Sequence, residues 1–212
     1  MLESIHGPES VHPTSEFLSH RKDGRYQTMT ELCDVEHDLP PHRFLFGHFI
    51  AASRDLLTRK YRMATLMRDP VDRSISIIRL HAHATGQRVS KLIENGTFLS
   101  SHVADFQTRV FGSKINGDLV RPQESPPATD ETLRQALLQI ARFDFVGMTE
   151  MYQESVDLFD KRFGTSLGGN IERINAAPAG DVGKDDLVPI VEPLVQRDME
   201  LYTYAKSISG LN

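Results

Sequence analysis

The sequence predicts an α/β fold built on a parallel sheet, and two features of residues 61 to 78 carry this prediction. Residues 61 to 67 mix β-branched, aromatic and apolar side chains without clean alternation, which is typical of a strand buried on both faces. Asp69-Pro70 then favours a helix start, with Asp as the N-cap and Pro in the first helical position. The helix that follows carries one apolar stripe, formed by Val71, Ile75 and Ile78.

The remaining chain supplies further candidate elements. A short apolar strand is expected over residues 44 to 50 and a second over residues 143 to 147. Helices are expected over residues 91 to 97, 132 to 142, 150 to 163 and 188 to 206. Thr149 is placed to cap the third of these helices, and Gly164 is placed to end it.

Composition limits what the protein can bind. A chain of 212 residues is long enough for one domain with a real core. The net charge of −5 gives the whole protein no electrostatic attraction to nucleic acid. Between residues 59 and 79 the sign reverses, with six cations (Arg59, Lys60, Arg62, Arg68, Arg73 and Arg79) against two acids (Asp69 and Asp72). A basic patch inside an acidic protein favours a confined anionic ligand over an extended polyanion.

The amino-terminal part of the chain offers no metal site. Residues 1 to 43 form a polar segment of uncertain structure, and the α/β domain is expected over residues 44 to 212. The histidines of this segment fit no metal-binding motif, and we expect no metal. Cys33 is the only cysteine, so no internal disulfide can form and a reducing compartment is favoured. Because no signal peptide or long apolar run is found, we expect a cytoplasmic protein without a membrane span.

Arg68 and Ser76 are the candidate ligand-binding residues. Arg68 follows the predicted strand directly, and Ser76 lies two turns into the next helix, outside its apolar stripe. Open α/β sheets bind ligands in crevices at the carboxyl ends of their strands. A guanidinium presents two parallel donors to a phosphate, and a serine hydroxyl adds a third. The alternative is that Arg68 pairs with Asp69 or Asp72 and that Ser76 is an ordinary helix residue.

The run Arg-Asp-Pro-Val-Asp-Arg-Ser-Ile-Ser, residues 68 to 76, resembles a segment of the sulfotransferases that use 3′-phosphoadenosine-5′-phosphosulfate (PAPS). In that family this segment binds the 3′-phosphate of the nucleotide, which implies that role for Arg68 and Ser76. The weaker resemblance runs from Phe44 to Lys206. It implies a P-loop-type, three-layer α/β/α fold with a central parallel sheet. It also implies transfer of a sulfuryl group from PAPS to a hydroxyl of a carbohydrate or similar acceptor, without a metal.

Two further site residues come from this resemblance. Gly47-His48 is similar to an element that carbohydrate sulfotransferases place before the strand of the 3′-phosphate segment, which makes His48 the candidate general base. A histidine can accept a hydroxyl proton at neutral pH; the alternative is a core histidine bonded to a carbonyl. Residues 105 to 112 are similar to a family segment near the acceptor, which makes Arg109 a candidate substrate contact. A solvated surface arginine is the alternative there.

One element of the family is missing. Such sulfotransferases begin with a strand and a glycine-rich loop, roughly Pro-Lys-x-Gly-[Gly/Ser]-[Thr/Ser], whose amides bind the 5′-phosphosulfate. Neither Lys22 nor Lys60 is followed by Ser or Thr, and no such loop precedes Arg68. The chain therefore resembles a sulfotransferase that lacks its first β–loop–α unit. A truncated relative that binds nucleotide or acceptor without catalysis is the alternative function, and a P-loop kinase is disfavoured by the same absence.

Overall fold

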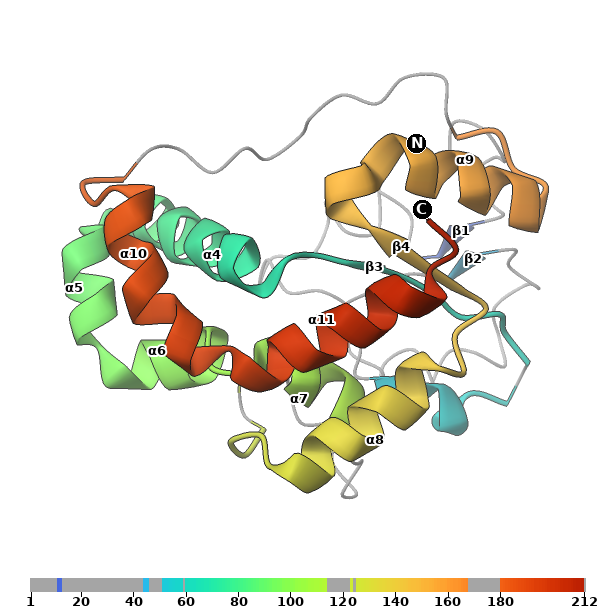
Figure 1. Ribbon diagram of the computed structural model, residues 1–212, viewed down its shortest axis with the longest axis horizontal. Helices are drawn as coiled ribbons and strands as arrows, with labels where there is room; N and C mark the ends of the chain where they lie inside the picture. The colour runs from blue at the N-terminus through green and yellow to red at the C-terminus, as the bar shows by residue number, and fades with distance from the viewer. Residues whose placement is uncertain are drawn as a thin grey trace.

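The computed structural model describes residues 11–12, 44–45, 51–58, 60–113, 123, 125–167 and 180–211. This part of the chain is mostly helical and contains two pairs of parallel strands (Figure 1). Strand β1 (Val11–His12) pairs with β2 (Phe44–Leu45), and strand β3 (Ala64–Met67) pairs with β4 (Phe145–Met148). The expected strand at residues 44 to 50 is thus present in its first two residues, and residues 46 to 50 lie outside the described part. An α/β fold with parallel pairing is confirmed at this level.

The β3–β4 pair joins segments that are far apart in the sequence. Its register runs from Ala64 opposite Phe145 to Met67 opposite Met148. The pairing is extended by the Met63 amide, which donates to a carboxylate oxygen of Asp144 at 2.9 Å. Because the strands are parallel, their carboxyl ends lie at the same edge. Arg68 and Thr149 therefore leave the sheet side by side.

Strand β3 departs from the prediction of burial on both faces. Met67 is buried, but Ala64 and Leu66 on the other face are exposed, Leu66 at 45 %. The side chains of a strand alternate between two faces, and here only one of these faces is packed into the core. The mixed apolar composition of residues 61 to 67 gave no indication of this asymmetry.

The helices form two groups, visible as the two halves of Figure 1. One group comprises α4 (Pro70–Thr85), α5 (Val89–Glu94), α6 (Gly96–His102) and α10 (Lys184–Val191). The other surrounds the β3–β4 pair and comprises the 3₁₀ turns η2 (Ala51–Leu56) and η4 (Thr149–Met151), with α7 (Phe106–Gly112), α8 (Asp130–Ile140), α9 (Tyr152–Phe163) and α11 (Gln196–Ile208). Turn η5 (Glu192–Leu194) connects α10 to α11.

Each group has its own hydrophobic core. The first core is made by α4, α5, α6 and α10 and includes Ile78, Leu92, Phe98, Leu187 and Val191. The second joins the sheet to α7, α8 and α11 and includes Met67, Phe111, Ile140, Met148 and Leu201. The helix expected over residues 132 to 142 is present as α8, which begins two residues earlier and ends two residues earlier, with Leu133, Ala136 and Ile140 buried. The β3–α4 connection crosses between the two cores.

Several helix boundaries follow local sequence chemistry, and others do not. Gly164 ends α9 in the left-handed region, with φ 66°, as predicted. Thr149 does not cap α9, because η4 intervenes and α9 begins only at Tyr152. The single helix expected over residues 188 to 206 is wrong. Pro193 lacks the amide proton that a continuous helix needs, and Val195 then leaves helical geometry, with φ −122° and ψ 27°, so α10 and α11 are separate.

The expected helix over residues 91 to 97 is also divided. Asn95 is extended, with ψ 92°, and its side chain accepts a hydrogen bond from the Phe98 amide at 3.1 Å. It therefore caps α6 as well as ending α5.

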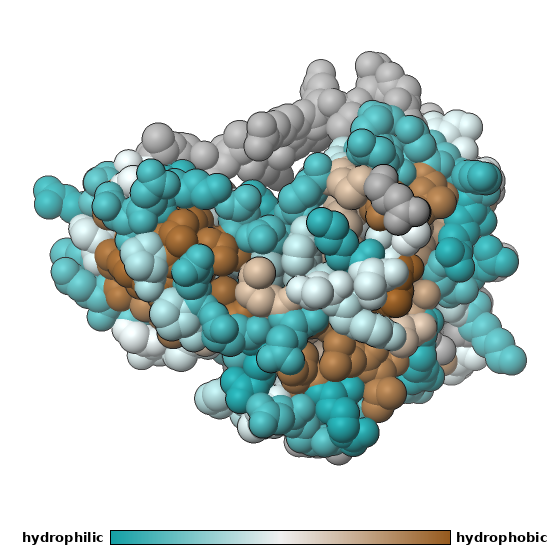
Figure 2. All heavy atoms as spheres, in the orientation of Figure 1, coloured by the Kyte–Doolittle hydropathy of each residue, from teal (hydrophilic) through white to brown (hydrophobic). Residues whose placement is uncertain are grey.

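Apolar side chains are visible on the face shown in Figure 2, at the α10 end and below α11, where α8 lies. Leu138 of α8 and Ile190 of α10 are exposed apolar side chains. In the described part of the chain, no helix combines the length and the hydropathy that crossing a bilayer requires.

Candidate functional site

The β3–α4 connection has the local structure that its sequence predicts. Asp69 is the N-cap of α4, and its Oδ1 accepts hydrogen bonds from the amides of Val71 and Asp72, each at 3.0 Å. Pro70 occupies the first helical position, where no amide proton is needed. The cap places Arg68 at the carboxyl end of β3, between the last sheet residue and the first turn of α4.

The carboxylates nearest to Arg68 in the sequence do not pair with its guanidinium. The acids that could neutralise it locally are engaged elsewhere, because Asp69 caps α4 and Asp72 forms an ion pair with Lys184 at 2.7 Å. The hydrogen bonds of Arg68 involve only its backbone, and within the described residues no side chain pairs with its guanidinium. The side chain is half-buried. The alternative in which Arg68 pairs with Asp69 or Asp72 is therefore not what the structure contains.

Ser76 lies in the second turn of α4, on the same strand–helix unit as Arg68. Its neighbours Ser74 and Ile75 are buried, whereas Ser76 itself is partly exposed. No described residue hydrogen bonds to its hydroxyl. A hydroxyl without a protein partner can donate to a bound anion at no cost to the helix. Arg68 and Ser76 therefore stand on one strand–helix unit, and no described side chain binds the guanidinium of the one or the hydroxyl of the other.

Arg73, the second arginine of the motif, is a structural residue. Its guanidinium lies over the ring of Phe106, 3.9 Å from the centroid, and its Nη1 donates to the carbonyl oxygen of His102 at 2.9 Å. Burial lowers the pKa of Arg73 to about 10, although the negative charge of Asp198 opposes the shift. These contacts attach α4 to α6 and α7.

Arg109 is almost completely buried in α7, at 1 % exposure. Its Nε donates to Ala104 at 3.1 Å and its Nη2 to Ser101 at 2.8 Å, both through carbonyl oxygens. Its Nη1 donates to the Ser125 carbonyl at 3.4 Å. The alternative of a solvated surface arginine is wrong. A contact between Arg109 and substrate stays a prediction, whereas its role in holding the loop before α7 is visible.

Positive charge is concentrated around one buried acid. The charges of Arg109 and Arg68 both lower the pKa of Arg73, so both of these guanidiniums lie within electrostatic range of Arg73. Asp198 of α11, whose charge acts on Arg73 and Arg109, is fully buried, and burial raises the pKa of its carboxyl to about 6. Hydrogen bonds from the amides of Thr108 and Gln107 act in the opposite direction. Acids are gathered here as well, because Asp69 and Glu150 stand at the same carboxyl edge of the sheet as Arg68.

Three residues of this region were not found by sequence reasoning. Gln107 and Glu150 bind the backbone at the end of β3, and Asp198 binds the start of α7. Gln107 lies inside the segment that resembles the family, and Asp198 lies in the expected carboxy-terminal helix. Neither position carries a local pattern that distinguishes it from an ordinary helix residue.

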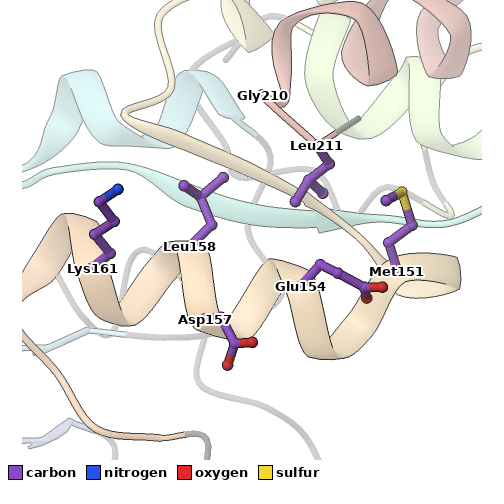
Figure 3. Close-up of a pocket in the computed structure, with 7 residues that line it drawn as sticks. All are labelled: Met151, Glu154, Asp157, Leu158, Lys161, Gly210 and Leu211. Carbon is purple, nitrogen blue, oxygen red and sulfur yellow. The ribbon is translucent and has the colours of Figure 1, made fainter.

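Other candidate features lie elsewhere or outside the described residues. His48, the candidate base, lies outside them, as does Gly47. No group of three or more metal-ligating side chains occurs in the described ranges. A shallow hollow of about 340 Å³ lies between α9 and the carboxy-terminal segment, lined by Met151, Glu154, Asp157, Leu158, Lys161, Gly210 and Leu211 (Figure 3). None of the predicted site residues lines it, and its mixed charges favour no particular ligand.

Comparison of the chain with protein-family models, with curated proteins and with solved structures finds no match in any of the three.

Proposed function

We propose that residues 44–212 form a PAPS-dependent sulfotransferase domain, in which Arg68 and Ser76 bind the 3′-phosphate of the nucleotide. The acceptor is a hydroxyl of a carbohydrate or a similar compound. The proposal includes the three-layer, P-loop-type arrangement of this family, of which the β3–β4 pair would be part. It rests on the resemblance of residues 68 to 76 and on the structure of the β3–α4 unit.

The observation that carries the proposal is the state of the Arg68 guanidinium. It stands at the carboxyl end of a parallel strand, half-buried, and the neighbouring carboxylates are engaged with α4 and with Lys184. Taking a guanidinium partly out of water is unfavourable unless an anion compensates it. A phosphate provides that compensation with bidentate geometry, and the Ser76 hydroxyl, to which no described residue hydrogen bonds, supplies a further donor.

In the proposed reaction the acceptor oxygen forms a bond to sulfur as the bond from sulfur to the phosphate oxygen breaks. The acceptor proton passes to a base, for which His48 is the candidate. Charge spreads over the peripheral sulfuryl oxygens, so positioning and positive donors supply most of the catalysis. Arg68 and Ser76 act at the far end of the nucleotide and contribute binding and orientation rather than chemistry.

The second candidate function is nucleotide or acceptor binding without catalysis. It is favoured by one specific observation, the absence from this sequence of a glycine-rich Pro-Lys-x-Gly loop before Arg68. The 3′-phosphate donors all come from one contiguous strand–helix unit and do not depend on that loop. Both functions therefore predict 3′-phosphate recognition by this chain, and they differ only in whether transfer follows.

Titration calorimetry tests the 3′-phosphate recognition that both functions predict. The ligands are adenosine 3′,5′-bisphosphate, adenosine 2′,5′-bisphosphate and 5′-AMP. We expect weak binding of the 3′,5′-bisphosphate and still weaker binding of the other two. Arg68→Ala should lose about 1.5–3 kcal/mol for the 3′,5′-bisphosphate, the range for a hydrogen bond to a charged group, or roughly tenfold to a hundredfold in affinity.

Arg88→Ala is the matched control for this titration. Arg88 is exposed beyond the opposite end of α4 and its side chain does not cap α5, so the replacement removes the same charge away from the site. Equal affinity for all three nucleotides, or equal losses in the two variants, would overturn the 3′-phosphate assignment. A sulfate-transfer assay with carbohydrate acceptors then separates the two candidate functions.

A further inference from the structure

The backbone at the end of β3 is bound by two side chains from distant parts of the chain. The Nε2 of Gln107 donates to the carbonyl oxygen of Arg68 at 3.0 Å, and the Arg68 amide donates to the Oε1 of Gln107 at 3.5 Å. The next amide, that of Asp69, donates to the Oε1 of Glu150 at 2.8 Å. Sheet pairing ends at Met67, so these side-chain contacts bind the backbone of the two residues that follow the last strand pair.

Gln107 is itself held rigidly. It is buried, at 8 % exposure, and lies in the first turn of α7. Its backbone amide donates to a carboxylate oxygen of Asp198 at 3.0 Å, so α11 fixes the helix that carries it. Because the Gln107 backbone is fixed and its carboxamide is hydrogen bonded, this side chain has little freedom to move. The Arg68 backbone, which is bonded to that carboxamide, is restricted in the same way.

Glu150 is held in the same manner from the other side. It follows β4, and its Oε2 accepts a hydrogen bond from the Tyr202 hydroxyl of α11 at 3.0 Å, while Thr149 donates to its Oε1 at 3.0 Å. Partial burial acts to raise the pKa of Glu150, but the hydrogen bonds from Asp69, Tyr202 and Thr149 outweigh it and lower that pKa. Glu150 is therefore a firmly ionised acceptor for the Asp69 amide.

We infer that Gln107 and Glu150 are positioning residues for the anion site, which hold the Arg68–Asp69 backbone so that the Arg68 guanidinium meets the 3′-phosphate. The inference rests on the proposed function. Both side chains bind backbone atoms and neither extends to the guanidinium, so they act through Arg68 rather than on the ligand. Bidentate binding of a phosphate requires a fixed direction of approach, which a long arginine side chain provides only from a fixed Cα.

A double-mutant cycle between Gln107→Met and Arg68→Ala tests the first half of the inference. Methionine keeps the length and the burial of glutamine but makes neither hydrogen bond. We expect Gln107→Met to weaken binding of adenosine 3′,5′-bisphosphate by about tenfold and to leave 5′-AMP binding unchanged. In the Arg68→Ala background the same replacement should have no further effect on affinity, because there is no guanidinium left to position.

Gln135→Met is the matched control, since Gln135 of α8 is bonded only to the exposed Glu131 in the same helix. A purely structural role for Gln107 lowers thermal stability in both backgrounds and leaves the preference for the 3′-phosphate intact, and that result would overturn the inference. If the wild type itself shows no such preference, the proposed function fails first and the inference fails with it.

Glu150 provides a second test that does not depend on the folding of the Gln107 variant. Glu150→Gln keeps an oxygen acceptor for the Asp69 amide and should retain most of the 3′-phosphate affinity, whereas Glu150→Ala should lose about tenfold. Equal behaviour of the two variants, in a wild-type background that prefers the 3′-phosphate, would remove Glu150 from the positioning role.

Discussion

Asp105 and Asp198 cap each other's helices. The Oδ1 of Asp105, at the start of α7, accepts hydrogen bonds from the amides of Arg197 at 2.9 Å and Asp198 at 3.2 Å in the first turn of α11. The carboxylate of Asp198 accepts hydrogen bonds from the amides of Gln107 at 3.0 Å and Thr108 at 2.6 Å in the first turn of α7. The Asp105 amide in turn donates to the carbonyl of Leu194 at 2.9 Å. Two helix starts are thus joined by direct hydrogen bonds.

Asp198, the buried member of this pair, makes the stability of the fold depend on pH. Burial raises the pKa of Asp198 from its ordinary 3.8 to about 6 in the folded protein. The folded state therefore holds a proton more tightly than the unfolded state between these pH values. The contribution of this group to stability is fully present below pH 4 and is lost as pH rises through 6, by about 3 kcal/mol.

Urea unfolding of the wild type and of Asp198→Asn, measured from pH 4 to pH 7.5, checks this. We expect the free energy of unfolding of the wild type, relative to the variant, to fall as pH rises from 4 to 7. Asp130→Asn is the control, since that carboxylate is 95 % exposed and pairs with Arg197 at the surface. If the free energy of unfolding of the wild type, relative to the variant, rose with pH, attraction of the Asp198 carboxylate to Arg73 and Arg109 would exceed the cost of its burial.

Gly112→Ala should strongly destabilise the protein. A Cβ at this position would lie 2.0 Å from the carbonyl oxygen of Thr132, because the end of α7 packs directly on the backbone of α8. Backbone cannot move aside as a side chain can, so we expect a loss of about 3 kcal/mol or more. Gly96→Ala is the matched control, since a Cβ there meets nothing within 4 Å. It should be neutral or stabilising by up to about 1 kcal/mol. Equal unfolding midpoints for both variants would contradict the close α7–α8 packing.

Ser76→Ala separates binding from stability. The hydroxyl has no hydrogen-bond partner among the described residues, and alanine is the better helix former, so thermal stability should be unchanged or slightly higher. Binding of adenosine 3′,5′-bisphosphate should weaken by about tenfold, as for loss of one hydrogen bond to a charged group. Ser100→Ala, on the exposed face of α6, should affect neither property. A stability loss without an affinity loss would place Ser76 in the fold rather than in the site.

His48→Ala tests the candidate base in a version of the protein that carries a glycine-rich loop and transfers sulfate. Turnover should fall by roughly 10²- to 10⁴-fold with little change in nucleotide affinity, the usual contribution of general base catalysis. The pH–rate profile should lose the limb that belongs to the histidine. An unchanged rate removes His48 from the reaction, and a parallel loss of stability supports the core-histidine alternative.

Local chemistry was readable from the sequence wherever one short segment decides the structure. The start of α4 at Asp69-Pro70 and the end of α9 at Gly164 depend only on capping and on backbone freedom, and both are confirmed. Pro193 should have signalled the break between α10 and α11, but the apolar periodicity on both sides of it suggested one helix.

The contacts that surround Arg68 could not be predicted in this way. Gln107 and Glu150 lie 39 and 81 residues from their backbone partners, and nothing in either local sequence specifies those partners. The exposure of Leu66 could not be predicted either, because a mixed apolar strand shows the same sequence pattern whether one or both of its faces are covered. Such features depend on how whole elements pack against one another. No single segment of the sequence determines that packing.

The register of β3 with β4 has a consequence for how the chain folds. The two strands come together only when a segment of about 80 residues, containing α4 to α8, closes into a loop, and the entropy of that closure opposes the pairing until other contacts are in place. Parallel pairing of this kind is slow compared with contacts between neighbouring helices. We therefore expect α7 and α8 to associate early, and the carboxyl edge of the sheet, with Arg68 on it, to be among the last parts of the molecule to form.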